Sequence, residues 1–199
     1  MNLILLIVAG YLVGSLSFAV IVSRAMGLPD PHSYGSGNPG ATNVLRTGKK
    51  LAAVLTLAGD ALKGLVVILV ARSLATTAGF GPGDIALGGL AAFLGHLYPI
   101  FFGFRGGKGV ATAAGVLFGL SVPLGGIVLA VWIAVFAISR VSSLGALAGA
   151  VAAPIATAFL VGNDLVIGAV VVMAALLIWR HRENIRRLRA GAEKRIGAK

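Results

Sequence analysis

The sequence of 199 residues contains no cysteine, only six acidic residues and only three histidines. The absence of cysteine excludes disulfides, thiolate nucleophiles and metal sites with cysteine ligands. The six acids and the scattered His32, His96 and His181 leave few ligands for a metal ion, so we expect no metal and no other cofactor. Charged residues make up 12% of the chain, about half the fraction of a typical soluble domain.

Hydrophobic residues make up 58% of the chain, and the mean hydropathy is +0.97. Such a composition indicates an all-α integral membrane protein, and we expect a single membrane-embedded domain over residues 1–199. Seven transmembrane helices are predicted: Leu3–Val22, Leu51–Leu74, Ile85–Phe102, Val110–Leu120, Val122–Ile138, Leu144–Val161 and Leu165–Trp179. The fourth is short and runs into the fifth, so six spans remain an alternative. The first lacks a charged residue ahead of it, and we interpret it as an uncleaved helix rather than a signal peptide.

Lysine and arginine are distributed unevenly between the loops. Loops after the first, third and fifth spans hold Arg24, Arg46, Lys49, Lys50, Arg105, Lys108 and Arg140, and the tail from Arg180 adds more. The alternate loops, Ala75–Asp84, the turn around Pro123 and Gly162–Asp164, contain none. The positive-inside rule therefore predicts an external N-terminus and a cytoplasmic C-terminus. This asymmetry and anionic membrane lipid account for the net charge of +11, so we expect no nucleic-acid partner.

The segment Gly103–Thr112, GFRGGKGVAT, is a glycine-rich, cationic interruption between two apolar runs. Glycines without Cβ atoms let backbone N–H groups approach an anion, and the following helix start adds its positive end. The candidate phosphate-binding residues here are Gly103, Arg105, Gly106, Gly107, Lys108, Gly109 and Thr112. The segment is not a Walker loop, because Gly-Val follows Lys108 where Ser or Thr is required. A plain interhelical turn with cytoplasmic cations is an equally good interpretation.

The loop Asp30–Arg46, DPHSYGSGNPGATNVLR, is long for a simple connection between helices, which favours a functional role. Turns in its glycine-rich part can present N–H groups to an anion, and an arginine can bind phosphate with two parallel hydrogen bonds. The candidates are Ser36, Gly37, Asn38, Gly40, Thr42, Asn43 and Arg46. The alternative is a polar surface loop.

Three further polar groups stand out. Ser142 and Ser143 precede an apolar run, which favours an N-cap, with phosphate-binding hydroxyls as the second interpretation. His181 and Asn184 are three residues apart, so both can point from one helical face into the bundle. Asp60 and Lys63, inside the second span, can form an i, i+3 ion pair with a structural role.

Four segments together carry a resemblance to a known family: SYGSGNPGATNVLR, GDALKG, GHLYPIFFGFRGGKGVAT and HRENIRRLRAGAE. In type and order they resemble the motifs of the bacterial acyl-phosphate:glycerol-3-phosphate acyltransferases, the PlsY family, over essentially the whole chain. The resemblance implies a seven-helix bundle in the bacterial cytoplasmic membrane, with its active site facing the cytoplasm. It also implies transfer of an acyl group from acyl phosphate to glycerol 3-phosphate, giving lysophosphatidic acid and phosphate.

The resemblance also implies roles for individual residues. Ser36 and Arg46 fall on essential positions of the first motif, and Gly103–Thr112 on the glycerol 3-phosphate loop. His181, Glu183 and Asn184 fall on the third motif, where we expect Glu183 to be structural. Acyl phosphate and glycerol 3-phosphate are then the substrates, membrane lipid surrounds the protein, and we expect it to work as a monomer.

The residues present fit direct attack of the glycerol hydroxyl on acyl phosphate, because the anhydride is already activated and no G-x-S-x-G elbow exists. The His-x4-Asp signature of acyl-thioester-using acyltransferases is also absent. The base can be His181 or a substrate phosphate oxygen, and the sequence leaves both open. Two other functions are alternatives: a transporter or scramblase for a phosphorylated solute, and an Mg²⁺-dependent phosphatidyl- or polyprenyl-transferase. One-sided polar motifs and the lack of an internal repeat disfavour the first, and scattered acids disfavour the second.

Overall fold

The computed structural model describes residues 2–195, and every regular element among them is helical. In chain order the elements are α1 (Leu3–Gly14), α2 (Phe18–Ala25), α3 (Ala41–Val44), η1 (Leu45–Thr47), α4 (Lys50–Ser73), α5 (Ala75–Ala78), α6 (Pro82–Leu97), η2 (Ile100–Phe102), α7 (Val110–Leu120), α8 (Val122–Ser139), α9 (Ser142–Leu160), α10 (Asp164–Arg180) and α11 (Arg182–Arg189).

Within residues 2–195, five helical segments are long and apolar enough to cross a membrane: Leu3–Ala25, Lys50–Ser73, Pro82–Phe102, Val122–Ser139 and Ser142–Leu160. The pair α10 and α11, bent by 55°, makes a sixth if it is taken as one span, and α7 is a shorter apolar helix. The all-helical membrane fold is thereby confirmed, with five or six spans by length and composition. The count of seven stays a prediction.

The outer surface of the helices is apolar. Ile138, Phe159 and Val122 are 88%, 87% and 70% exposed, respectively, and many other large hydrophobic side chains are also exposed. Water would disfavour such a surface, whereas lipid chains solvate it. The side chains that point outward are therefore those of a protein surrounded by lipid.

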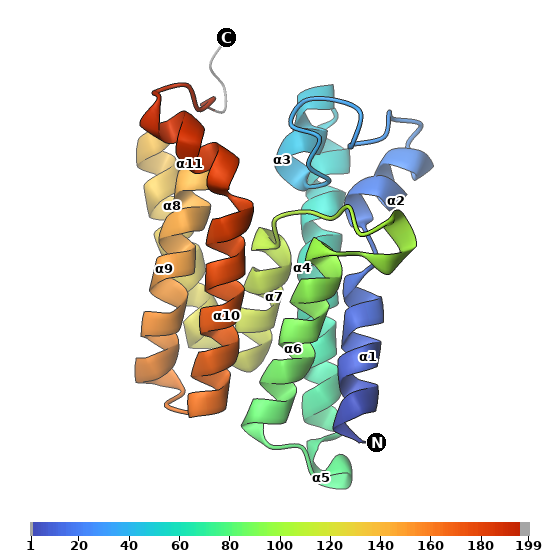
Figure 1. The fold of residues 1–199 in the computed structure, drawn as a ribbon, viewed down its shortest axis with the longest axis vertical. Helices are drawn as coiled ribbons and strands as arrows, with labels where there is room; N and C mark the ends of the chain where they lie inside the picture. Colours follow the sequence, from blue (N-terminus) through green and yellow to red (C-terminus); the bar gives the residue numbers. More distant parts are fainter. Residues whose placement is uncertain (1, 196–199) are drawn as a thin grey trace.

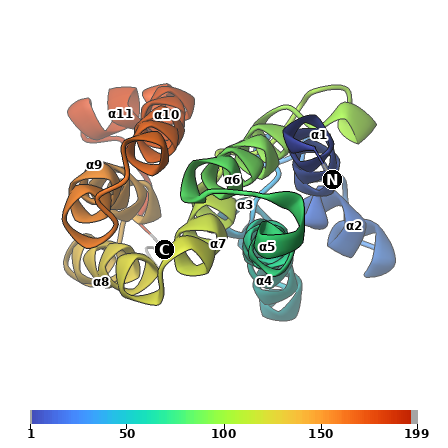
Figure 2. The same ribbon diagram turned by 90° about the horizontal axis from the view of Figure 1, so that it is seen from below.

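The long helices form two groups that meet at α7. Helices α1, α4 and α6 pack together, α8, α9 and α10 form the second group, and α7 lies between them (Figure 2). Glycines allow the closest approaches: a Cβ on Gly115 of α7 would lie 1.9 Å from the Ala61 carbonyl oxygen of α4. The helices of this pair therefore touch through their backbones, as small residues permit in membrane bundles.

The polar segments lie at one end of the bundle. The loop that contains α3, the loop between η2 and α7, and α11 all lie in the half of the molecule away from the N-terminus and α5, with the loop between η2 and α7 nearest the middle (Figure 1). The expected gathering of the polar motifs on one side is thus confirmed, and the motifs lie above the ends of α4, α6, α7 and α10.

Candidate active site

A cavity of about 840 Å³ opens among these segments and continues down between the helices. Its upper part is polar and its lower part is apolar. The polar part is lined by Ser36, Asn38, Gly40, Thr42, Asn43, Arg46, Asp60, His96, Lys108, Gly109, Ser142, Ser143, His181, Asn184, Arg187 and Glu193. Most of the residues that the sequence singled out are therefore brought together, although they come from five separate segments.

The apolar part of the cavity is formed by α7, α8, α9 and α10. Leu117, Val128, Leu129, Trp132, Ala146, Gly149, Ala150, Ala153, Val170, Met173, Ala174 and Leu177 line it. The small residues on α9 leave room where larger side chains would close the space between α8 and α10. The resulting shape is that of a site for a molecule with a charged head and an apolar chain.

Asn43 organises the first loop from inside. Its side-chain oxygen accepts hydrogen bonds from the Ser36 N–H at 2.9 Å and the Ser36 hydroxyl at 3.2 Å. Its amide nitrogen donates to the carbonyls of Pro31 at 2.8 Å and Tyr34 at 3.2 Å. Both amide hydrogens are thus engaged within the loop, so Asn43 shapes the loop rather than offering the donor expected from the sequence. Ser36 and Arg46, both exposed, remain available to a ligand.

The loop between η2 and α7 is fixed by its carbonyl groups. The Arg180 guanidinium donates to the Gly106 carbonyl at 2.7 Å and to the Gly107 carbonyl at 3.2 Å. Because these carbonyls are turned toward Arg180, the loop can present Lys108 to the cavity, where its ammonium contacts the Asn184 side-chain oxygen. Burial, together with nearby cations of which Arg187 has the largest effect, lowers the pKa of Lys108 to about 8.

His181 marks the bend between α10 and α11. It is only 3% exposed, and its Nδ1 donates to the Leu177 carbonyl at 2.8 Å, which leaves Nε2 as the acceptor of a neutral ring. Burial lowers the pKa of His181 to about 4, so the ring is neutral at pH 7. Asn184 is buried too, and both side chains line the cavity, which confirms the predicted shared face.

Glu193, which the sequence analysis did not single out as a site residue, lies at the centre of the polar part. It accepts hydrogen bonds from the Ser143 hydroxyl at 2.7 Å, from the Arg187 Nε at 2.6 Å and from the Asn184 amide. Although burial raises the pKa of Glu193, these hydrogen bonds hold it below its ordinary value. One carboxylate therefore joins three donors of the polar part, one from α9 and two from α11.

One expectation for this region needs correction. The N-cap interpretation of Ser142 and Ser143 is wrong: Val141 is the N-cap of α9, no side chain caps it, and Ser143 instead binds Glu193. Glu183 lies on the outer surface, 51% exposed, and pairs with Arg186 at 2.6 Å. The glutamate that ties α11 to the bundle is therefore Glu193. A long-range contact of this kind leaves no periodic signal in the sequence.

Some predicted site residues lie outside the main cavity. Thr112 is fully buried in α7, and its carbonyl oxygen lies against Gly64 of α4. Gly37, Arg105 and Gly106 line a separate hollow of about 400 Å³. Neither hollow is lined by Gly103, Gly107 or Lys63. For Gly103 the structure shows a left-handed backbone with φ of +60°, as a tight turn requires.

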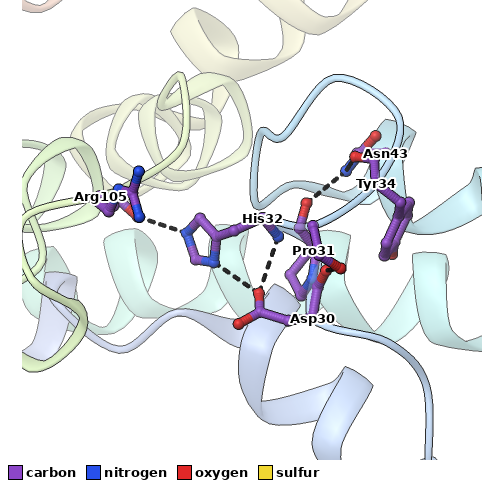
Figure 3. Close-up of polar contacts among 7 residues, drawn as sticks. Asp30, Pro31, His32, Tyr34, Asn43 and Arg105 are labelled. Carbon is purple, nitrogen blue, oxygen red and sulfur yellow. Dashed lines mark hydrogen bonds and ion pairs between the residues drawn. The ribbon is translucent and has the colours of Figure 1, made fainter.

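His32 joins the two loops at this smaller hollow. Its Nδ1 lies 2.7 Å from an Asp30 carboxylate oxygen, and its Nε2 lies 2.8 Å from the Arg105 carbonyl oxygen (Figure 3). The Asp30 carboxylate also accepts from the His32 N–H at 2.9 Å (Figure 3). The first loop is thereby attached to the second loop on the side away from Lys108.

Comparisons with known proteins agree with this geometry. The family model for glycerol-3-phosphate acyltransferase matches residues 4–191. A glycerol-3-phosphate acyltransferase of Thiobacillus denitrificans is 58% identical over 194 residues, covering 98% of this chain and 97% of the relative. One from Cupriavidus metallidurans is 56% identical over 198 residues, covering 100% and 98%.

Two crystal structures of PlsY, an integral membrane glycerol 3-phosphate acyltransferase, are similar to this fold. The glycerol 3-phosphate form superposes with a TM-score of 0.91 at 39% identity, covering 98% of this chain and 96% of that one. The lysophosphatidic acid form gives 0.89 at 38% identity, covering 98% and 95%.

Proposed function

The chain belongs to the glycerol-3-phosphate acyltransferase family, the PlsY family, and we propose that it moves a fatty acyl group from acyl phosphate to the sn-1 hydroxyl of glycerol 3-phosphate. It is a multi-pass membrane enzyme, a glycerol-3-phosphate acyltransferase of bacterial type. The products of the proposed reaction are lysophosphatidic acid and inorganic phosphate, which makes it the first acylation step of phospholipid synthesis.

The two-part cavity is the observation that carries the proposed donor. An acyl phosphate has a long apolar chain and a small, highly charged head. The apolar part between α7, α8, α9 and α10 suits the chain, and the cations Arg46, Lys108 and Arg187 suit two phosphate groups. Because chain and head are bound in one continuous cavity, the acyl carbonyl would lie where its apolar and polar parts meet.

In the proposed reaction the sn-1 oxygen of glycerol 3-phosphate attacks the acyl carbon. The bond between that carbon and the phosphate oxygen breaks, and phosphate leaves with the electron pair. The hydroxyl proton passes to a phosphate oxygen or to Nε2 of His181, whose lone pair is free. Cations around the phosphates neutralise charge and hold both substrates together, which are the main sources of rate when no covalent enzyme intermediate forms.

The side chains of the site support direct transfer. The Ser36 hydroxyl donates to the Asn43 amide oxygen, which is not a base. The Ser143 hydroxyl donates to Glu193, whose pKa is lowered by its other hydrogen bonds, so this carboxylate is a weak base for activating a nucleophile. A transporter remains the second candidate, because buried charges such as Asp60 and Lys63 also occur on transport pathways.

Product formation tests the proposal. Detergent-purified protein is incubated with radiolabelled glycerol 3-phosphate and either an acyl phosphate or the matching acyl thioester. We expect lysophosphatidic acid from the acyl phosphate alone. Product from the thioester alone would overturn the proposed donor. Uptake of glycerol 3-phosphate into proteoliposomes without any product would favour the transporter.

The proposed topology has seven spans, an external N-terminus and an active site that faces the cytoplasm across the inner membrane, with one chain sufficient for activity. The lack of cysteine makes labelling direct, since single cysteines can be added to the natural chain. In intact cells an impermeant maleimide should label Thr77→Cys, in α5, and should leave Lys49→Cys, beside the first loop, unlabelled until the cells are opened. The reverse pattern would invert the topology. Cross-linking and activity measurements on the detergent-dispersed protein test whether one chain is sufficient, since a monomer should be active without forming cross-linked dimers.

A further inference from the structure

A buried polar cluster lies beneath the two loops and includes Asp60, Lys63 and His96. The Lys63 ammonium lies 2.8 Å from an Asp60 carboxylate oxygen, 3.0 Å from His96 Nδ1 and 2.7 Å from the Leu16 carbonyl oxygen. All three side chains are less than 7% exposed. Two of these contacts are hydrogen bonds, to His96 and to the Leu16 carbonyl, and the contact with Asp60 is an ion pair.

The Leu16 carbonyl needs such a partner because it lies in a helix break. Helix α1 ends at Gly14 and α2 begins at Phe18, so Leu16 lies between the two helices. An unpaired carbonyl at membrane depth is costly, and the Lys63 side chain supplies the missing donor. The cluster thus links the break between α1 and α2 to α4 and α6.

The same hydrogen bonds fix the form of His96. His96 Nδ1 lies 3.0 Å from the Lys63 ammonium, which can only donate, and 3.5 Å from an Asp60 carboxylate oxygen. With the shorter contact as the hydrogen bond, Nδ1 accepts, and the hydrogen of the neutral ring is on Nε2. The ring is therefore held in one orientation, with its Nε2 edge turned away from Lys63.

The Nε2 edge of His96 lies directly against the glycine loop. A Cβ on Gly107 would lie 2.2 Å from His96 Nε2 and 3.0 Å from the Pro39 carbonyl oxygen. The His96 carbonyl oxygen also accepts the Gly107 N–H at 3.1 Å. His96 therefore supports the loop through both its ring and its backbone, beside the first loop, and Lys108 is the next residue along the chain.

We propose that His96 is a positioning residue for glycerol 3-phosphate. The Asp60–Lys63 pair holds the His96 ring, and the edge of the ring sets the position of the Gly107 backbone. The position of Gly107 in turn determines how far the Lys108 ammonium extends into the cavity. The inference rests on the proposed function, and it assigns to the cluster a task that the ion pair alone does not have. Binding of the substrate then depends on the contact between the His96 ring and Gly107, although His96 directs no charge at the substrate.

Two substitutions distinguish the positioning of Gly107 from the other role of His96, which is to accept a hydrogen bond from the buried Lys63. In His96→Asn the side-chain oxygen can replace Nδ1 as the acceptor for Lys63, but nothing replaces the ring edge against Gly107. In His96→Gln the amide nitrogen reaches the place of Nε2, but the Lys63 acceptor is lost. The kinetic constants of both variants are measured with each substrate varied in turn, and the midpoint of thermal unfolding serves as the fold control.

The expected result is a split between the two variants. His96→Asn should raise the KM for glycerol 3-phosphate about 10- to 100-fold, since a displaced binding group costs this much, with an unfolding midpoint near that of the natural protein. His96→Gln should keep a KM closer to the natural value and unfold at lower temperature. A natural KM in His96→Asn would overturn the inference, because the cluster would then only satisfy Lys63.

A double-mutant cycle with Gly107→Ala gives a second, independent test. The added Cβ collides with the ring in the natural protein and should raise the same KM, but it should do less further harm in His96→Asn, where the ring is gone. Additive effects would overturn the inference. If His96→Asn does not fold, Gly107→Ala alone decides: an unchanged KM contradicts the proposed contact. Failure of the natural protein to form product would instead reject the proposed function.

Discussion

Ser143 at the start of α9 donates its hydroxyl hydrogen to Glu193 at 2.7 Å, across 50 positions of sequence. The same carboxylate receives Arg187 and Asn184 from α11. One acidic side chain therefore attaches the C-terminal segment to the rim of the cavity and holds three donors of the site in place.

Glu193→Ala should destabilise the protein. It leaves Arg187, Asn184 and Ser143 without their shared acceptor, and loss of charged hydrogen bonds costs about 1.5–3 kcal/mol. Glu183→Ala is the matched control, because Glu183 is exposed and its ion pair with Arg186 lies on the surface. That control should change the free energy of unfolding by less than about 0.5 kcal/mol. Equal effects in a thermal or denaturant titration would contradict the role of Glu193.

Removal of the cations in the cavity should weaken substrate binding. Lys108→Ala should raise the KM for glycerol 3-phosphate by about 10- to 100-fold, since a charged hydrogen bond to phosphate is worth about 1.5–3 kcal/mol. Arg46→Lys should also raise the KM for whichever of the two substrates has its phosphate bound by Arg46, because an ammonium does not reproduce the planar guanidinium. Lys49→Ala and Arg189→Lys, both exposed and outside the cavity, serve as controls. Folded variants with natural kinetics would show that these cations do not bind phosphate.

The pH dependence should report Lys108. Its pKa of about 8 means that the ammonium, which we propose binds phosphate, is present below pH 8 and is lost as the pH rises through that value. We therefore expect kcat/KM for glycerol 3-phosphate, which reports the free enzyme, to fall above about pH 8. Lys108→Arg should move this fall to higher pH, because a guanidinium stays charged. An unchanged alkaline limb in Lys108→Arg would assign the limb to another group.

His181 should orient the attacking hydroxyl more than it accepts the proton. A ring with a pKa of about 4 is a weaker base than a phosphate group, whose second pKa is near 6. His181→Ala and His181→Asn should then lower kcat by less than about 10³-fold, because general-base assistance accounts for about 10²–10⁴-fold where it operates. The test is to measure kcat of both variants in detergent, with thermal unfolding as the control for folding. A larger loss in both stable variants would make His181 the base.

Turnover should not require a divalent metal. The acids near the site already have partners: Asp60 pairs with Lys63 at 2.8 Å, and Glu193 receives three donors. We expect the same rate of product formation with and without EDTA. Loss of activity in EDTA that Mg²⁺ restores would favour the metal-dependent transferase instead.

Much of this protein was determined by the sequence alone, because a lipid environment constrains sequence strongly. Backbone groups must be satisfied within helices, so apolar runs located most of the long helices to within a few residues. The first predicted helix, Leu3–Val22, was wrong as one continuous helix, because the structure breaks it between Gly14 and Phe18, and the third ends as an α-helix at Leu97. The polar interruptions before Arg46 and around Lys108 stood out against those runs. The helical spacing of His181 and Asn184 was enough to place both on one buried face.

Only the tertiary structure decided which side chains meet. Glu193 rather than Glu183 joins α11 to α9, and His96 lies under Gly107, because these contacts depend on the depth and rotation of packed helices. The apolar half of the cavity has the same origin: Gly149, Ala150 and Ala153 read as ordinary helix-packing residues, but their position opposite α8 and α10 leaves the space open. Hydropathy fixes which segments are helical, whereas the register between helices is set by side-chain packing that no single segment contains.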